Sequence, residues 1–473
     1  MIALFNDDGT LGWTRTRLAF AWVVVAALAY QRGQQAWDNF NDGNRPDGNY
    51  GHMQIDFGGQ YMLGRVLVEG HGPDLYTRER HLEIARQRFP REHEAPGQEK
   101  ADAEKLVDWF PATEDKVVSG PLYPPIHAFV MAPVAAIDSP QVAYRVWQAA
   151  MLLWLIAGGW AARVISRGAI WWPVGAAMLI GFSGARSGLD LGQNCALTVT
   201  LILAGWALRT RGRPVLAGVV WGLLAFKPVW AMSFFGALVF LRQWRMLAAM
   251  GATGLGLIAA TLPVVGVECW KNWLAVGKVA SAIYLTDSNW IHLSRDVFGI
   301  PRRFMLTFID GGGQAMDDRP AVAYIGWAIW GFIAGVTAFV AWRRRLARHL
   351  HGPGPALAFL AAWLCTYRFM YYDSLIAAAG VLVLLAKPGR FLRWSSWPIA
   401  SWGLALAAAP FVIENLLVPQ GVQFTLHFPR RPEDYSDVTA AVNDHYAWDT
   451  VAVFALWAWC VRTVWFRWDD EFV

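Results

Sequence analysis

Cysteine is scarce in this sequence, and its spacing argues against two kinds of site. The chain has four cysteines, which lie far apart and mostly within apolar runs: Cys195, Cys269, Cys365 and Cys460. Because no CxxC pair is present, the sequence indicates neither a zinc site nor a disulfide framework. The first apolar run is followed by YQRGQQAW, which offers no small-residue cleavage site. We therefore expect that run to remain as a signal anchor.

Charged residues are also few, and long apolar runs take their place. Only 16% of the 473 residues are charged, 55% are hydrophobic, and the mean hydropathy is +0.29. Segments such as LAFAWVVVAALAY and GATGLGLIAATLPVVGV approach the ~20 residues that a helix needs to cross the hydrocarbon of a bilayer. A soluble core helix is rarely apolar on all sides. The sequence therefore predicts an all-α polytopic membrane protein, with one integral membrane domain over residues 1–473.

The net charge of +5 reflects arginine-rich connectors between apolar runs, not a nucleic-acid surface. Short basic loops stay in the cytoplasm, which gives both termini a cytoplasmic position in a multi-pass protein of the cytoplasmic (inner) membrane. About twelve spans are then predicted, near residues 16–31, 142–162, 169–183, 191–208, 213–226, 229–241, 246–266, 320–341, 355–370, 374–387, 397–416 and 447–462.

One apolar segment, YPPIHAFVMAPVAAI at 123–137, does not fit this count. If it crossed the membrane, every later basic loop would change sides, so we predict a re-entrant or interfacial helix. The larger loops then lie outside the membrane at 32–141, 267–319 and 417–446.

The first outer loop has two distinct parts. After Asp56, the spacing of Leu63 and Val66 against Gln60 and Arg65 predicts an amphipathic juxtamembrane helix that lies in the interface. The tract 81–118 is charged and poor in aliphatic residues, which predicts a solvated excursion.

Ionisable residues are nearly absent from the middle of the predicted spans and gather at one membrane face. Each has an ordinary structural explanation: a carboxylate can cap a helix, Lys227 can snorkel, and His292 can be packed in a loop. The presence of both charge signs on one face instead favours a reaction on an anionic lipid. The candidates are Asp56, Arg186, Asp190, Lys227, His292, Arg295, Arg368, Asp373, Glu414 and Asp449.

Four segments in order, over residues 54 to about 240, resemble glycosyltransferase family 87. They are DFGGQYMLGRVLVEGHGPDLY, YPPIHAFVMAPVA, GLDLGQNCALTVTLILAGWAL and RTRGRPVLAGVVWGLLAFKP. The resemblance implies a GT-C fold and transfer of a sugar, most often mannose, from a polyprenyl-phosphate donor to a lipid-linked or glycan acceptor at the outer face. Mannose, arabinose and other sugars stay open, as do the acceptor, the linkage and the oligomeric state.

The resemblance also implies roles for residues. Asp56 takes the position of the catalytic base, and we expect donor-phosphate binding by Lys227, Arg186, His292 and Arg295. Further active-site candidates are Asp190, Gln193, Asn194, His127, Tyr123 and Asp373. Some GT-C groups carry paired acids in these loops, whereas this chain has Asp-Phe and Asp-Leu-Gly-Gln, so we expect neither a metal nor another cofactor.

Two other classes fit the same charges. A flippase or transporter for a lipid-linked sugar would share the lipid-facing cations, but it would be expected to show inverted repeats and broken helices at the midplane. A lipid-linked polymer ligase also acts at the outer leaflet. The sequence shows no internal repeat, which favours the transferase.

Overall fold

The described part of this computed structural model is helical, with isolated bridges in place of β-strands. It comprises residues 14–41, 55–89, 104, 107–108, 110–182, 184–306, 320–346, 349–386 and 447–471. This confirms the predicted all-α fold class. The principal helices are α1 (Arg15–Asn41), α2 (Ile55–Val68), α3 (Arg78–Arg88), α5 (Pro125–Ala135), α6 (Pro140–Ile165), α7 (Trp172–Ile180), α8 (Ala185–Leu191), α9 (Cys195–Thr210), α10 (Pro214–Gly222), α11 (Pro228–Phe240), α12 (Trp244–Thr286), α13 (Ser288–Leu293), α14 (Gly299–Met305), α15 (Pro320–Arg343), α16 (Pro353–Leu364), α17 (Ala378–Leu384) and α21 (Trp448–Glu471), with 3-10 turns η2 (Gly72–Asp74), η3 (Leu223–Phe226) and η5 (Tyr371–Ala377).

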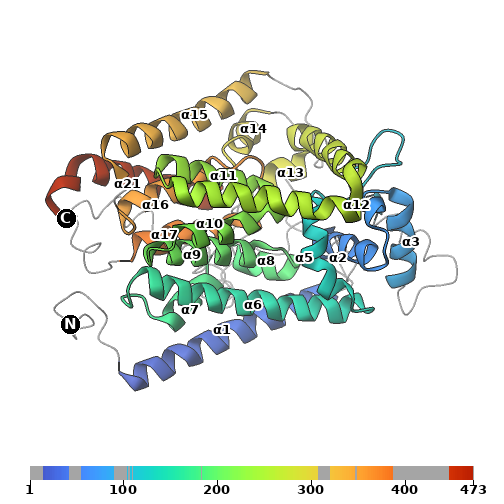
Figure 1. The fold of residues 1–473 in the computed structure, drawn as a ribbon, viewed down its shortest axis with the longest axis horizontal. Helices are drawn as coiled ribbons and strands as arrows, with labels where there is room; N and C mark the ends of the chain where they lie inside the picture. The colour runs from blue at the N-terminus through green and yellow to red at the C-terminus, as the bar shows by residue number, and fades with distance from the viewer. Residues whose placement is uncertain are drawn as a thin grey trace.

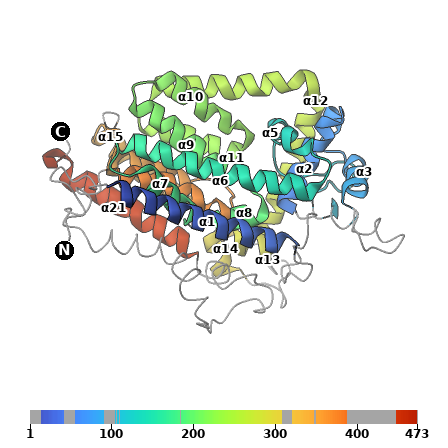
Figure 2. The ribbon, with the colours of Figure 1, turned by 90° about the horizontal axis from the view of Figure 1, so that it is seen from below.

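The long helices run roughly along one direction, with α2, α3 and α5 gathered at one end (Figures 1 and 2). Within the described residues, four helices are long and apolar enough to cross a membrane: α6, α12, α15 and the Asp449–Phe466 part of α21. The other described spans of the prediction correspond to α1 and to shorter helices packed between these four, and the predicted span 397–416 lies outside the described residues.

Proline and glycine explain much of this packing. Many of the helices begin with proline in their first turn, where the missing N–H leaves no hydrogen bond unmade. Glycines let helices approach closely: a Cβ at Gly159 of α6 would lie 2.4 Å from the backbone nitrogen of Ala176 in α7. A Cβ at Gly218 of α10 would lie 2.2 Å from the carbonyl oxygen of Met246 in α12. Small residues at such contacts are the usual means of packing helices within a bilayer.

Helix α12 contains a break at Gly266, the residue at which the sequence analysis ended a predicted span. Gly266 has φ 76° and ψ 166°, and Pro263 precedes it, so the backbone changes direction there (Figure 2). The predicted span ended at this residue, but the chain beyond it stays helical to Thr286. The second predicted outer loop, 267–319, therefore begins as a helix and continues into the short helices α13 and α14.

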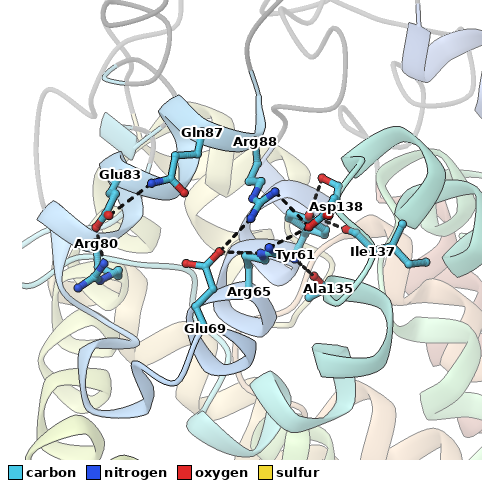
Figure 3. Close-up of polar contacts among 10 residues, drawn as sticks. All are labelled: Tyr61, Arg65, Glu69, Arg80, Glu83, Gln87, Arg88, Ala135, Ile137 and Asp138. Atoms are coloured by element: carbon cyan, nitrogen blue, oxygen red, sulfur yellow. Dashed lines mark hydrogen bonds and ion pairs between the residues drawn. The ribbon is translucent and has the colours of Figure 1, made fainter.

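A network of charged side chains joins α2, α3 and the start of α6 (Figure 3). Arg65 of α2 pairs with Glu69 at 2.7 Å and with Asp138 at 2.9 Å. Arg88 at the end of α3 reaches the same two carboxylates at 3.4 and 3.1 Å. The Tyr61 hydroxyl donates to a carbonyl of the α5–α6 connection at 2.8 Å. These contacts fix α2, the helix that carries Asp56.

The environment of α2 differs from the amphipathic interfacial helix expected from the sequence. Its apolar residues Phe57 and Leu63 are buried, but so are the polar residues Gln60 and Arg65. The polar side is covered because Gln60 and Arg65 bond to neighbouring backbone and side chains instead of to water.

Candidate active site

Asp56 lies in the first turn of α2 and keeps part of its surface exposed. Burial raises its pKa from 3.8 to about 7, while a hydrogen bond from Gln193 and the positive charge of Lys227 act in the opposite direction. Within the described part of the chain, this carboxylate makes no salt bridge and its Oδ2 atom receives no hydrogen bond. A carboxylate with a pKa near neutrality is suited to accepting a proton at physiological pH.

Gln193 holds the other carboxylate oxygen. Its Nε2 atom donates to Asp56 Oδ1 at 2.5 Å, and its Oε1 atom accepts from the Tyr123 hydroxyl at 2.6 Å. Gly192, with φ 65°, forms the turn between α8 and α9 that presents Gln193. A Cβ at Gly192 would lie 2.7 Å from Phe57 Cβ, so the close approach of this turn to α2 requires glycine. Two segments far apart in sequence thus meet at one carboxylate.

A second amide, that of Gln60, ties the same elements together. Its Nε2 atom donates to the carbonyl oxygens of Asp56 at 2.8 Å and Gly192 at 3.0 Å, and its Oε1 atom lies 2.9 Å from His127 Nε2. Because Gln60 Oε1 can only accept, the His127 contact requires a proton on Nε2. The His127 ring stacks on Tyr123 with centroids 4.2 Å apart. His127 and Tyr123 therefore support the Asp56 environment from α5 and the segment before it.

Lys227 lies between η3 and α11, as the sequence placed it between two short apolar segments. The structure adds a partner: Lys227 Nζ is 2.7 Å from Asp373 Oδ1, and both side chains are buried. Trp230 Nε1 donates to the other oxygen of Asp373 at 3.1 Å. An ammonium has three N–H donors, and Asp373 accepts one of them. The charges of Lys227 and Asp373 both act on the pKa of the Asp56 carboxyl, Lys227 lowering it and Asp373 raising it.

Arg295 and His292, expected at the donor phosphate, are buried and contact other groups of the protein. The Arg295 side chain is fully buried, and its Nε atom is 3.1 Å from Asp449 Oδ2. Arg295 also donates to the carbonyl of His292 at 2.8 Å, and its own backbone N–H bonds to Phe369 at 3.0 Å. This buried ion pair anchors the chain before η5, the turn that carries Asp373.

The remaining candidates form the α8–α9 side of the site. Arg186 and Asp190 lie on α8 and are partly buried, and the charge of Asp190 contributes to the raised pKa of Asp56. Asn194 is fully buried, and neither atom of its side-chain amide has a hydrogen-bond partner in the described structure. The guanidinium of Arg368 lies over the rings of Tyr284 and Tyr367, and Glu414 falls outside the described residues.

Three carboxyl groups, those of Asp56, Asp190 and Asp373, contribute to the electrostatics of this region. Across the described residues, no group of three or more His, Cys, Asp or Glu side chains lies close enough to hold a metal ion. Asp373 is already engaged by Lys227 and Trp230.

The sequence reasoning overlooked three contributors to the site. Gln60 follows Asp56 by four residues, and this helical spacing could have indicated that the two share a face. Tyr372 directly precedes Asp373, and its ring centroid lies 5.6 Å from Lys227 Nζ. Trp230 follows Lys227 by three residues, but nothing in the sequence indicates that it bonds to Asp373.

Comparison with known protein families gives a match. The family model described as glycosyltransferase family 87 matches residues 122–367, slightly more than half of the chain. No curated protein and no solved structure matches the chain.

Proposed function

Because the chain belongs to glycosyltransferase family 87 and is therefore a glycosyltransferase, we propose that it uses a polyprenyl-phosphate sugar as donor. Mannose is the sugar we favour, and the acceptor is a lipid-linked or glycan hydroxyl. The reaction takes place at the outer face of the cytoplasmic membrane, where the site and the three larger loops lie in this proposal. It proceeds with inversion at the anomeric carbon and without a metal.

The observation that supports this proposal is the state of Asp56. Its pKa of about 7, its partly exposed position and its unbonded Oδ2 atom suit a general base. Gln193 and Tyr123 orient the carboxylate through Oδ1 and leave Oδ2 for the acceptor hydroxyl. One base suffices for direct displacement, whereas glycoside hydrolysis uses two carboxylates.

The proposed reaction is a single displacement. The acceptor oxygen forms a bond to the anomeric carbon as the bond from that carbon to the phosphate oxygen breaks, and its proton passes to Asp56 Oδ2. The electron pair of the broken bond stays on the polyprenyl phosphate. Solvent then takes the proton from Asp56, which returns the base to its starting state.

The leaving phosphate gains negative charge, and a nearby cation stabilises it. Lys227 is our candidate, because Asp373 uses one of its N–H donors and holds the ammonium in place, and its charge acts on the Asp56 carboxyl. Arg186 is the second candidate from the α8 side. The unbonded amide of Asn194 is a further group that a substrate hydroxyl or phosphate oxygen would satisfy. Arg295 donates through Nε to Asp449, so it and His292 follow Lys227 and Arg186 as candidates for the donor phosphate.

The test uses membranes containing the purified protein, radiolabelled polyprenyl-phosphate mannose and a lipid extract that supplies acceptors. The proposal expects label to move to a new product, with loss of that transfer in an Asp56→Asn variant. Movement of intact donor between leaflets without a new product would identify a flippase. Activity only with a pyrophosphate-linked donor would identify a ligase.

A further inference from the structure

An open cavity of about 440 Å³ lies at the end of the bundle opposite Asp56, where α6 and α9 end. Figure 1 shows these two helix ends near α7, away from α2. Helix α9 begins beside Gln193 and ends at Thr210, so its 16 residues separate the two sites by about 24 Å, at 1.5 Å per residue. The cavity is thus independent of the proposed active site.

The lining of this cavity is strongly basic. Its polar side chains come from Arg163, Arg167, Thr210, Arg211 and His351. The three arginines are exposed, and none of them forms a salt bridge within the described part of the chain. No Asp or Glu occurs in the segments 139–189, 191–267 and 319–372, which supply these helices.

The helix ends themselves oppose this charge only in part. The C-terminal ends of α6 and α9 each contribute roughly half a negative charge, or about one together. Three guanidinium groups therefore leave a clear positive excess in the cavity. Arg167 also holds a left-handed backbone conformation, φ 53°, which is strained for a residue with a side chain. A strained backbone conformation persists only where the surrounding structure holds the residue in it.

The residues around the cavity indicate that it lies near the boundary between the membrane and water. Helix α6 is one of the four apolar spans, and Arg163 lies in its last turn. Trp160, one turn earlier, is exposed, and the Arg211 guanidinium lies 5.4 Å from the centroid of its ring. Tryptophan and arginine together at the end of a span are typical of the lipid headgroup level.

We propose that this cavity binds a phosphate-bearing anion, either the headgroup of an anionic lipid in that leaflet or a soluble phosphate ester. Arginine donates paired hydrogen bonds to phosphate oxygens, and basic pockets between membrane helices bind anionic headgroups in this way. The ligand site is separate from the donor site and does not depend on the identity of the transferred sugar.

The test measures binding of phosphatidic acid to the purified full-length protein by native mass spectrometry, with zwitterionic phosphatidylcholine as the reference of zero net charge. Glycerol 3-phosphate is titrated in parallel to represent a soluble ligand. The cavity variant carries Arg163→Gln, Arg167→Gln and Arg211→Gln. We expect it to lose at least roughly tenfold in affinity, since hydrogen bonds to charged groups are each worth about that factor or more.

The matched control carries Arg213→Gln, Arg242→Gln and Arg245→Gln, which remove the same charge from exposed positions outside the cavity lining. It should bind like the native protein. Preference for phosphatidic acid alone identifies a lipid site, and equal displacement by glycerol 3-phosphate identifies a soluble ligand.

Equal losses in the two triple variants would overturn the proposal, because they would show that surface charge and not the cavity binds the anion. Native protein that binds phosphatidic acid no better than phosphatidylcholine, and does not bind glycerol 3-phosphate, would do the same. If the cavity variant fails to fold, the single exposed change Arg211→Gln repeats the comparison, with an expected loss of several-fold in affinity.

Discussion

Replacing Asp56 with asparagine removes the proposed base while keeping the size of the side chain. Asparagine caps a helix about as well as aspartate, and its Oδ1 atom can still accept the hydrogen bond from Gln193. It cannot accept the proton of the acceptor hydroxyl. We therefore expect initial transfer rates to fall by ~10²-fold or more, which corresponds to at least about 2.7 kcal/mol in the activation barrier.

The pKa of Asp56 adds a pH dependence to this prediction. With a pKa of about 7, the base is about 9% ionised at pH 6 and about 91% ionised at pH 8, so the native rate should rise about tenfold between them. Stability changes in the opposite direction. The folded pKa lies above the unfolded value of 3.8, so the folded state holds a proton that the unfolded state releases. That stabilisation is complete below pH ~4 and is lost as pH rises through 7.

Asparagine lacks this titration, so the Asp56→Asn variant should be at least as thermally stable as the native protein at pH 8. The assays are initial transfer rate from radiolabelled donor between pH 5.5 and 8.5, and thermal midpoint at the same pH values. The control is Glu114→Gln, which changes an exposed carboxylate in the same predicted outer loop as Asp56. It should leave the transfer rate and the thermal midpoint unchanged. An Asp56→Asn enzyme with more than about a tenth of the native rate would refute the assignment of a general base.

Four other predictions follow from the same contacts. Gln193→Ala removes a hydrogen bond that lowers the pKa of the base, so the midpoint of the pH–rate profile should move above 7; an unchanged midpoint would show that Gln193 does not orient the carboxylate. Lys227→Ala should lower the thermal midpoint by leaving the Asp373 carboxylate buried and unpaired, at a cost of about 3–5 kcal/mol, whereas Lys227→Gln with Asp373→Asn should regain stability but not donor affinity. Normal donor affinity in the double variant would remove Lys227 from the phosphate site. Transfer should continue in excess EDTA, and abolition with rescue by Mn²⁺ or Mg²⁺ would contradict the metal-independent reaction. A cysteine at Arg213 should resist an impermeant thiol reagent in intact cells while one at Glu114 reacts, and the reverse pattern would overturn the orientation.

Local properties of the chain made several features predictable. The helical membrane class follows from apolar runs, because a spanning backbone must satisfy its own hydrogen bonds. The position of Lys227 between two short helices follows from proline and the length of the flanking apolar runs. The helix after Asp56 was also predictable, although its burial was not. The helix beyond Gly266 was not predicted, because hydropathy marks apolar membrane spans and that segment is of mixed polarity.

The sequence by itself determined which chemical groups are present: a carboxylate at the start of α2, an amide-bearing turn after α8 and a lysine between short apolar helices. Only the tertiary structure decided how they pair. Asp373 meets Lys227 across 146 positions of sequence and Asp449 meets Arg295 across 154, so one expected phosphate ligand became a structural anchor and another gained a fixed partner. The reason is physical. A buried charge must find its counter-charge, and which one lies within reach depends on how the helices pack, which no local pattern records.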